Sequence, residues 1–133
     1  MPASSATPSA ISVLAERSQL DFELLFLNDL LTRLPHYTDA LRVHAMNQFA
    51  KGQLKECLLT ELKLVELRPT DPDARYSLAC RYAGLHQPDL AIETLRQAID
   101  LGFRDFRTMI QDKQLESVRR DARFRALLKR EIA

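Results

Sequence analysis

A chain of 133 residues is long enough for one domain with its own hydrophobic core, without disulfides or metals. Hydrophobic residues make up 46% and charged residues 28%, as in ordinary globular proteins, and a formal net charge of +1 indicates no partner by overall charge. Only three glycines and no tryptophan, with many Leu, Ala, Arg and Glu residues, favour an all-helical fold.

Charge is uneven along the chain. Residues 1–101 carry ten Lys or Arg against thirteen Asp or Glu, whereas residues 102–133 carry nine against five. A basic tail can serve nucleic acid, but it is more often the solvated face of terminal helices. Because acidic residues and Leu127 and Leu128 interrupt this tail, we expect no nucleic-acid partner, and the tail is the one region that argues for such a partner.

The two cysteines, Cys57 and Cys80, lack the spacing of a disulfide framework, which favours a reducing compartment. The N-terminal sequence MPASSATPSA lacks the basic start and apolar run of a secretory signal. The most apolar segment, residues 24–27, is far shorter than the roughly 20 apolar residues that cross a bilayer. We therefore predict a soluble, cytoplasmic protein without membrane contact.

The predicted elements begin with a disordered leader over residues 1–10, because these Ser, Ala, Pro and Thr residues have little to bury. A first helix is expected from about Ile11 or Ser18 to Leu34, and Pro35 stops it. Its apolar residues are too many for one narrow stripe, so the helix packs on two sides or leaves an apolar face for another chain. The candidate residues for self-association on this helix are Phe22, Leu25 and Phe26.

The second and third helices are expected over about residues 38–50 and 54–67. Gly52, between them, suits the left-handed conformation that ends a helix. Pro69 closes the unit, and Asp71-Pro72 then gives a strong start signal for a fourth helix.

The fourth helix is expected to end at Gly84, and a fifth to run from Pro88 to about Leu101. A short helix near residues 104–111, a turn and a last helix over residues 121–131 complete the chain. No stretch alternates apolar and polar residues for long enough to form a strand, so the fold class is all-α.

The sequence repeats itself with a period of 34 residues. Pro35 and Pro69 lie 34 residues apart, and Asp39-Ala40 matches Asp73-Ala74 at the same offset. This period, with units of two helices, is the signature of the tetratricopeptide repeat. In residues 71–103 the chain resembles that family residue by residue, through its alternation of large and small side chains at Leu78, Ala79, Tyr82, Ala91, Leu95 and Ala98. Residues 112–128 are similar to the C-terminal capping segment of small bacterial members, with Ala122 in place of the usual proline.

The resemblance implies a short right-handed α-solenoid of antiparallel helix pairs, with about six to seven helices. After the leader, residues 11–133 are expected to form a single tetratricopeptide-like domain. Its parts are a half-repeat helix at about 18–35, repeats at 38–71 and 72–103, and a cap at 104–133. The first repeat is degenerate, because Gln48 stands where the second repeat has Tyr82, and Glu61 stands where it has Leu95.

The sequence gives no sign of catalysis or of a cofactor. The three histidines, His36, His44 and His86, lie on separate segments, and no pair of Cys or His residues has the spacing of a zinc site. No glycine-rich phosphate loop and no nucleophile elbow occurs. We expect a protein that is not an enzyme and that holds no metal or cofactor.

In this family the first helix of each repeat lines a concave groove that receives extended peptides or helices. The matching positions here are Asp39, Arg42, Met46 and Phe49 on one helix, and Asp73, Tyr76 and Cys80 on the next. The sequence leaves open whether Met46 and Phe49 face this groove or pack against the first helix. Met46 and Ser77 replace the asparagines of the family's carboxylate clamp, so the sequence does not support the activity of the chaperone-tail binders.

We therefore expect a non-catalytic protein–protein interaction module, such as an adaptor, a scaffold or a co-chaperone-like protein, that binds a peptide or helix in the groove. The alternative is a homo-oligomerisation module, for example a homodimer, that assembles through the apolar first helix.

Overall fold

The computed structural model describes the backbone of residues 3–132 and the side chains of residues 11–131 other than Leu14. The helices are α1 (Ala3–Arg33), α2 (Thr38–Ala50), α3 (Leu54–Leu67), α4 (Pro72–Gly84), α5 (Pro88–Asp100), α6 (Phe106–Gln111), the 3₁₀ helix η1 (Lys113–Val118) and α7 (Ala122–Ile132). No strand occurs within residues 3–132, and the all-α prediction is confirmed.

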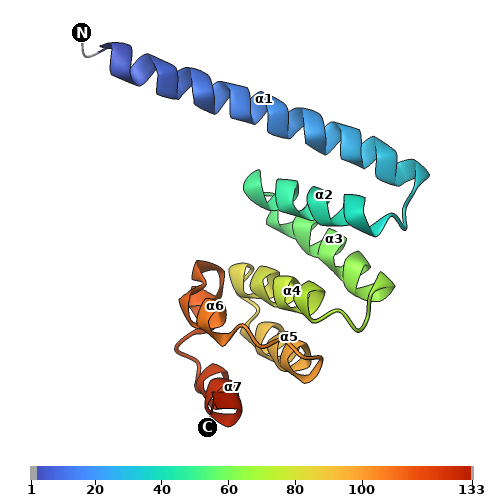
Figure 1. Ribbon diagram of the computed structural model, residues 1–133, viewed down its shortest axis with the longest axis vertical. Coiled ribbons are helices and arrows are strands. Elements are labelled where there is room, and N and C mark those ends of the chain that lie inside the picture. The colour runs from blue at the N-terminus through green and yellow to red at the C-terminus, as the bar shows by residue number, and fades with distance from the viewer. Residues whose placement is uncertain (1–2, 133) are drawn as a thin grey trace.

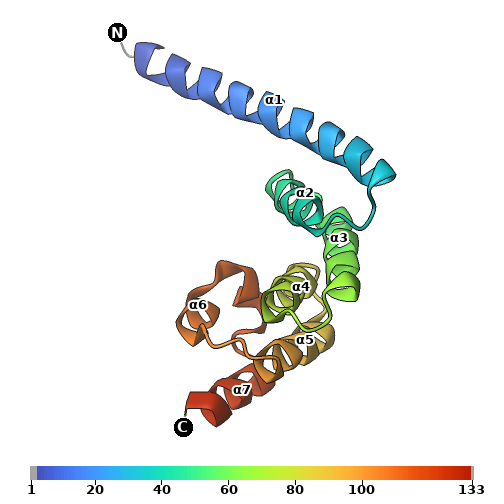
Figure 2. The same cartoon turned by 45° about the vertical axis from the view of Figure 1, so that its right-hand side comes forward.

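The helices form two hairpins that stack on one another (Figure 1). α2 packs against α3, α4 packs against α5, and α3 joins the two hairpins by packing against α4. Figure 2 shows α1 along one edge of this stack, with α6 and α7 at the opposite end. The architecture is the short α-solenoid of helix pairs that the sequence predicts.

The α4–α5 hairpin is held together by small side chains where the two helices approach each other. Ala79, Ala91 and Ala98 are completely buried, and Leu95 fills the adjoining space. The Asp71 side chain accepts hydrogen bonds from the backbone N–H groups of Asp73 and Ala74, at 2.9 and 3.3 Å, and so starts α4 as the sequence predicts.

The turns of the two hairpins use a left-handed residue at the same point of the repeat. Gly52 has a φ of 83°, and His86, 34 residues later, has a φ of 58°. Gly84 is the last residue of α4, so the left-handed conformation lies on a histidine rather than on this glycine. A side chain in this conformation is strained by about 1–2 kcal/mol relative to glycine.

The hydrophobic core is largest in the C-terminal half of the chain. Buried residues of α4 and α5 form one cluster with residues from the segments that follow them, namely Met109, Leu115, Val118, Phe124 and Leu127. Residues 104–131 therefore close the apolar surface of the last hairpin, as a solenoid cap must. The further division of the domain into repeats and a cap stays a prediction.

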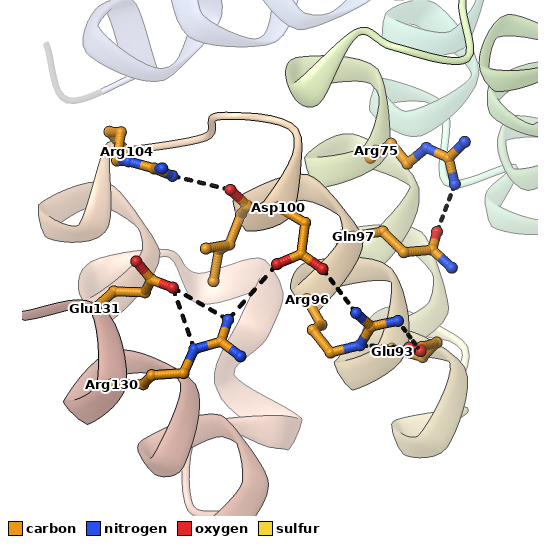
Figure 3. A network of polar contacts seen from close by, with 9 residues as sticks. Arg75, Glu93, Arg96, Gln97, Asp100, Arg104, Arg130 and Glu131 are labelled. Carbon is orange, nitrogen blue, oxygen red and sulfur yellow. Dashed lines mark hydrogen bonds and ion pairs between the residues drawn. The ribbon is translucent and has the colours of Figure 1, made fainter.

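Ion pairs link α7 to α5 on the surface (Figure 3). Asp100 of α5 accepts a hydrogen bond from Arg96 at 2.7 Å and lies 3.7 Å from a nitrogen of Arg130, which also pairs with Glu131 at 3.1 Å. These groups are largely exposed, so water and salt screen their attraction. We infer that buried apolar residues, above all Phe124, hold α7 in place.

α1 is longer than the sequence predicted. The disordered leader over residues 1–10 was wrong for residues 3–10, which belong to the helix, while residues 1 and 2 lie outside the described part of the chain. A helix that has already nucleated extends at low cost, and Ala and Ser residues are compatible with it. Although α1 has 31 residues, no helix within residues 3–132 is long and apolar enough to cross a membrane.

Only the C-terminal part of α1 packs on the solenoid. The residues that contact it there are half-buried leucines, namely Leu24, Leu27, Leu30 and Leu31. The Asn47 amide of α2 donates to Glu23 at 3.2 Å, and Lys51 forms an ion pair with Asp21 at 2.7 Å. Figure 1 shows the N-terminal part of α1 extending well past α2.

Candidate interaction surfaces

One candidate surface is a groove whose wall is α2. Arg42, Met46 and Phe49 lie on one face of this helix because they are spaced by four and three residues. Met46 is 69% exposed and Phe49 is 40% exposed, so both side chains are open to solvent. Of the two alternatives that the sequence left open, the structure supports exposure on this face.

The floor of the groove is built around a buried ion pair between α3 and α4. Nε of Arg81 lies 2.8 Å from Oε1 of Glu61, and both side chains are almost inaccessible to solvent. Arg81 also donates to the Gln114 side chain at 2.6 Å. Its guanidinium carbon lies 4.2 Å from the ring centre of Phe49, within the range of a cation–π contact. A single arginine thus links α2, α3, α4 and η1.

The position of Glu61 explains why the first repeat departs from the family pattern there. Burial raises the pKa of the Glu61 carboxyl to about 7, and Arg81 opposes this shift. The Cys57 thiol donates a further contact to Glu61 at 3.5 Å, in the interior of the α2–α3 hairpin. The second repeat has Leu95 at the matching position, completely buried, so a polar contact replaces an apolar one in the first repeat.

The opposite wall of the groove is the segment from Asp112 through η1. It packs across α4, so Leu115 and Val118 enter the core while the Ser117 hydroxyl donates to the Ala83 carbonyl at 2.8 Å. Asp112 accepts a hydrogen bond from the Tyr76 hydroxyl at 2.7 Å. The C-terminal segment therefore covers the part of α4 that the sequence assigned to the groove.

This packing corrects the assignment of Cys80. It is only 2% exposed, with its sulfur 3.9 Å from Oδ2 of Asp112, and it does not offer an open contact surface. Burial raises the pKa of its thiol to about 12. Tyr76 is half-buried, and its ring stacks on that of Phe103 at 4.4 Å, so its main contacts are within the fold.

Two hollows remain open along the groove, with volumes of about 400 and 540 Å³. Phe49, Arg81 and Gln114 line both of them and therefore lie between them. The smaller hollow extends towards Arg42, Met46 and Ser77, and the larger towards Leu54, His86 and Lys113. Their walls are mainly apolar, so they suit bulky apolar side chains of another polypeptide.

The remaining groove candidates lie at the ends of helices. Asp39 and Asp73 are exposed residues in the first turns of α2 and α4, where the helix dipole favours acidic side chains. Arg42 forms an ion pair with Asp71, the residue that caps α4. The sequence missed Glu61, Arg81 and Gln114, although the glutamate in place of an expected leucine was a signal.

A second candidate surface is the face of α1 that points away from the solenoid. Phe22, Leu25 and Phe26 are 64%, 73% and 53% exposed, and the two phenylalanine rings stack with 6.3 Å between their centres. Three large apolar side chains on one exposed helix face indicate a contact site for another protein.

Metal chemistry finds no support in these surfaces. No group of three His, Cys, Asp or Glu residues that could hold a metal ion occurs among the described residues. His44 is buried, and burial lowers the pKa of its ring, as for a packed neutral histidine.

Comparisons with known proteins support the fold. No family model matches the chain. It is 33% identical over 86 residues to a chloroplastic protein of Arabidopsis thaliana, and the match covers 62% of this chain and about a quarter (26%) of that protein. A solved structure described as "MamA RS-1 ArsTM double mutant" is similar with a TM-score of 0.61 at 20% identity, over 89% of this chain and 71% of that one. MamA contains tetratricopeptide repeats, so this chain has a tetratricopeptide-like fold, which typically serves non-catalytic protein–protein interaction.

Proposed function

We propose that this protein is a non-catalytic adaptor or scaffold that binds a peptide or helix of another protein in the groove between α2 and η1. The observation that carries the proposal is the pair of apolar hollows on either side of Phe49 and Arg81. A bound segment can place one bulky side chain in each hollow, while Met46 packs against it.

The buried ion pair supports this function by making the groove rigid. Glu61 and Gln114 hold the Arg81 guanidinium from two sides, and the guanidinium holds the Phe49 ring. A rigid site loses less entropy on binding than a mobile one. In this proposal, residues 11–133 act as a single tetratricopeptide-like domain, and the cap at 104–133 supplies one wall of the site.

Affinity capture from a lysate of the source cells tests groove binding. Met46→Glu is expected to reduce the recovery of specific partners about tenfold or more, because a carboxylate would be buried without a counter-charge. Leu59→Glu on α3 is the matched control, since Leu59 is 66% exposed but does not line the groove hollows. Quantitative mass spectrometry compares the captured sets, with both variants first shown to be folded by circular dichroism.

Equal partner sets for wild type and Met46→Glu would contradict groove binding. Arg42 and Tyr76 are less suitable for substitution, because each contacts a residue that organises the fold, Asp71 or Asp112. Loss of binding in their variants would not separate the groove from the fold.

A second candidate function is self-assembly through α1, as a homodimerisation module. The specific observation in its favour is the exposure of Phe22, Leu25 and Phe26 on a face that no other part of the described chain covers. The two functions are compatible, because the groove and this face of α1 are separate surfaces.

A further inference from the structure

The exposed face of α1 extends further than its three large residues. Ile11, Ala15, Ser18, Phe22 and Leu25 are separated by steps of four and three residues, and all are exposed. This alternation is the spacing that keeps side chains along one seam between two paired helices. The seam ends at Asp29 and Arg33, which form an ion pair with each other at 2.8 Å.

The sizes of the side chains along this seam are unequal. The two residues near its middle, Ala15 and Ser18, are small, whereas the C-terminal part carries Phe22, Leu25 and Phe26. Two parallel helices would set large residues against large ones and leave the small ones facing a gap. Two antiparallel helices would set the large residues of each against the small residues of the other, which fills space evenly.

We infer that α1 pairs with α1 of a second copy in antiparallel orientation, with Ser18 next to the two-fold axis. In this register Ala15 faces Phe22 of the second copy, and Ile11 faces Phe26. The inference rests on the second candidate function, self-assembly through α1, and specifies its geometry.

Charge favours the same orientation. Arg17 and Asp21 are both exposed and flank the seam near its middle. With Ser18 near the axis, Arg17 of each copy lies beside Asp21 of the other, so two opposite-charge contacts form. A parallel pair would instead place each of these charges beside its own copy, and like charges repel.

The other end of the solenoid favours a second copy over an open chain of copies. The apolar surface of the last hairpin is already covered by η1 and α7, and α7 carries exposed Arg125 and Lys129. Head-to-tail stacking of α1 onto this end would therefore bury charge. A symmetric contact of α1 with itself closes after two copies and leaves no apolar end exposed.

Disulfide trapping of the full chain tests the register. The chain has two cysteines, Cys57 and Cys80, and both are buried, so Ser18→Cys adds the single exposed thiol. The two introduced thiols meet at the axis, and mild oxidation is expected to link most chains into dimers. Ala15→Cys is the matched control, because its two copies are offset by about 10 Å along the helices, beyond the roughly 7 Å limit for a disulfide.

Sedimentation velocity of the wild-type chain at tens of micromolar accompanies the trapping and is expected to show a dimer. The inference is supported if Ser18→Cys cross-links at least tenfold faster than Ala15→Cys. A monomeric wild type would overturn self-assembly itself. A dimer in which both variants cross-link equally, or neither does, would overturn the antiparallel register and leave self-assembly standing.

Discussion

Arg81→Met is expected to lower the free energy of unfolding by about 3–5 kcal/mol, because Glu61 would stay buried without its positive partner. The two groups are 2.8 Å apart and almost fully buried, so water cannot replace the lost contact. The Gln114 side chain and the Phe49 ring would also lose the guanidinium that holds them. Urea unfolding followed by circular dichroism measures the change.

The double variant Glu61→Leu/Arg81→Met is the control for this prediction. It removes both charges and restores a leucine, the residue that the second repeat has at the matching position. Replacing a whole buried ion pair with apolar residues is often neutral or stabilising. We therefore expect most of the lost stability to return, and an Arg81→Met variant within about 1 kcal/mol of wild type would show that the pair contributes little.

Phe124→Ala is expected to cost about 3–5 kcal/mol, because it leaves a cavity where α7 closes the core. Phe124 is among the largest fully buried side chains and joins the cluster formed by α4, α5 and η1. The surface ion pairs of Figure 3 cannot compensate, since they are exposed. Thermal and urea unfolding give the change.

Ile110→Ala on α6 is the matched control, because Ile110 is a large apolar residue that is exposed rather than buried. Its cost is expected to stay within about 0.5 kcal/mol. If Phe124→Ala were no more costly than this control, the C-terminal segment would not be an integral part of the core.

The sequence predicted those parts of the fold that depend on local rules. Asp71-Pro72 starts α4, Gly52 takes the left-handed conformation, and Ala79 and Ala91 lie where the helices approach each other. Each of these follows from backbone geometry or from side-chain size at a fixed spacing. The 34-residue period then places one hairpin on the next.

The candidate site was less predictable, because it depends on contacts between distant residues. The Asp112 carboxylate reaches Tyr76 across 36 positions of the sequence, and this contact puts the cap over Cys80. A repeat pattern states which helix faces are inward, and it does not state which of them the cap covers. In the same way, Glu61 stood out from the pattern, but its partner Arg81 could be identified only from the fold.

Photo-cross-linking from position 46 tests groove binding most directly. A benzoylphenylalanine in place of Met46 points into the smaller hollow and reacts with a bound polypeptide within a few ångströms. Irradiation in a lysate of the source cells is expected to give covalent adducts with a defined partner, and the same residue in place of Leu59 is expected to give none. Adducts from position 59 or from position 25 on α1, with none from position 46, would contradict binding in the groove.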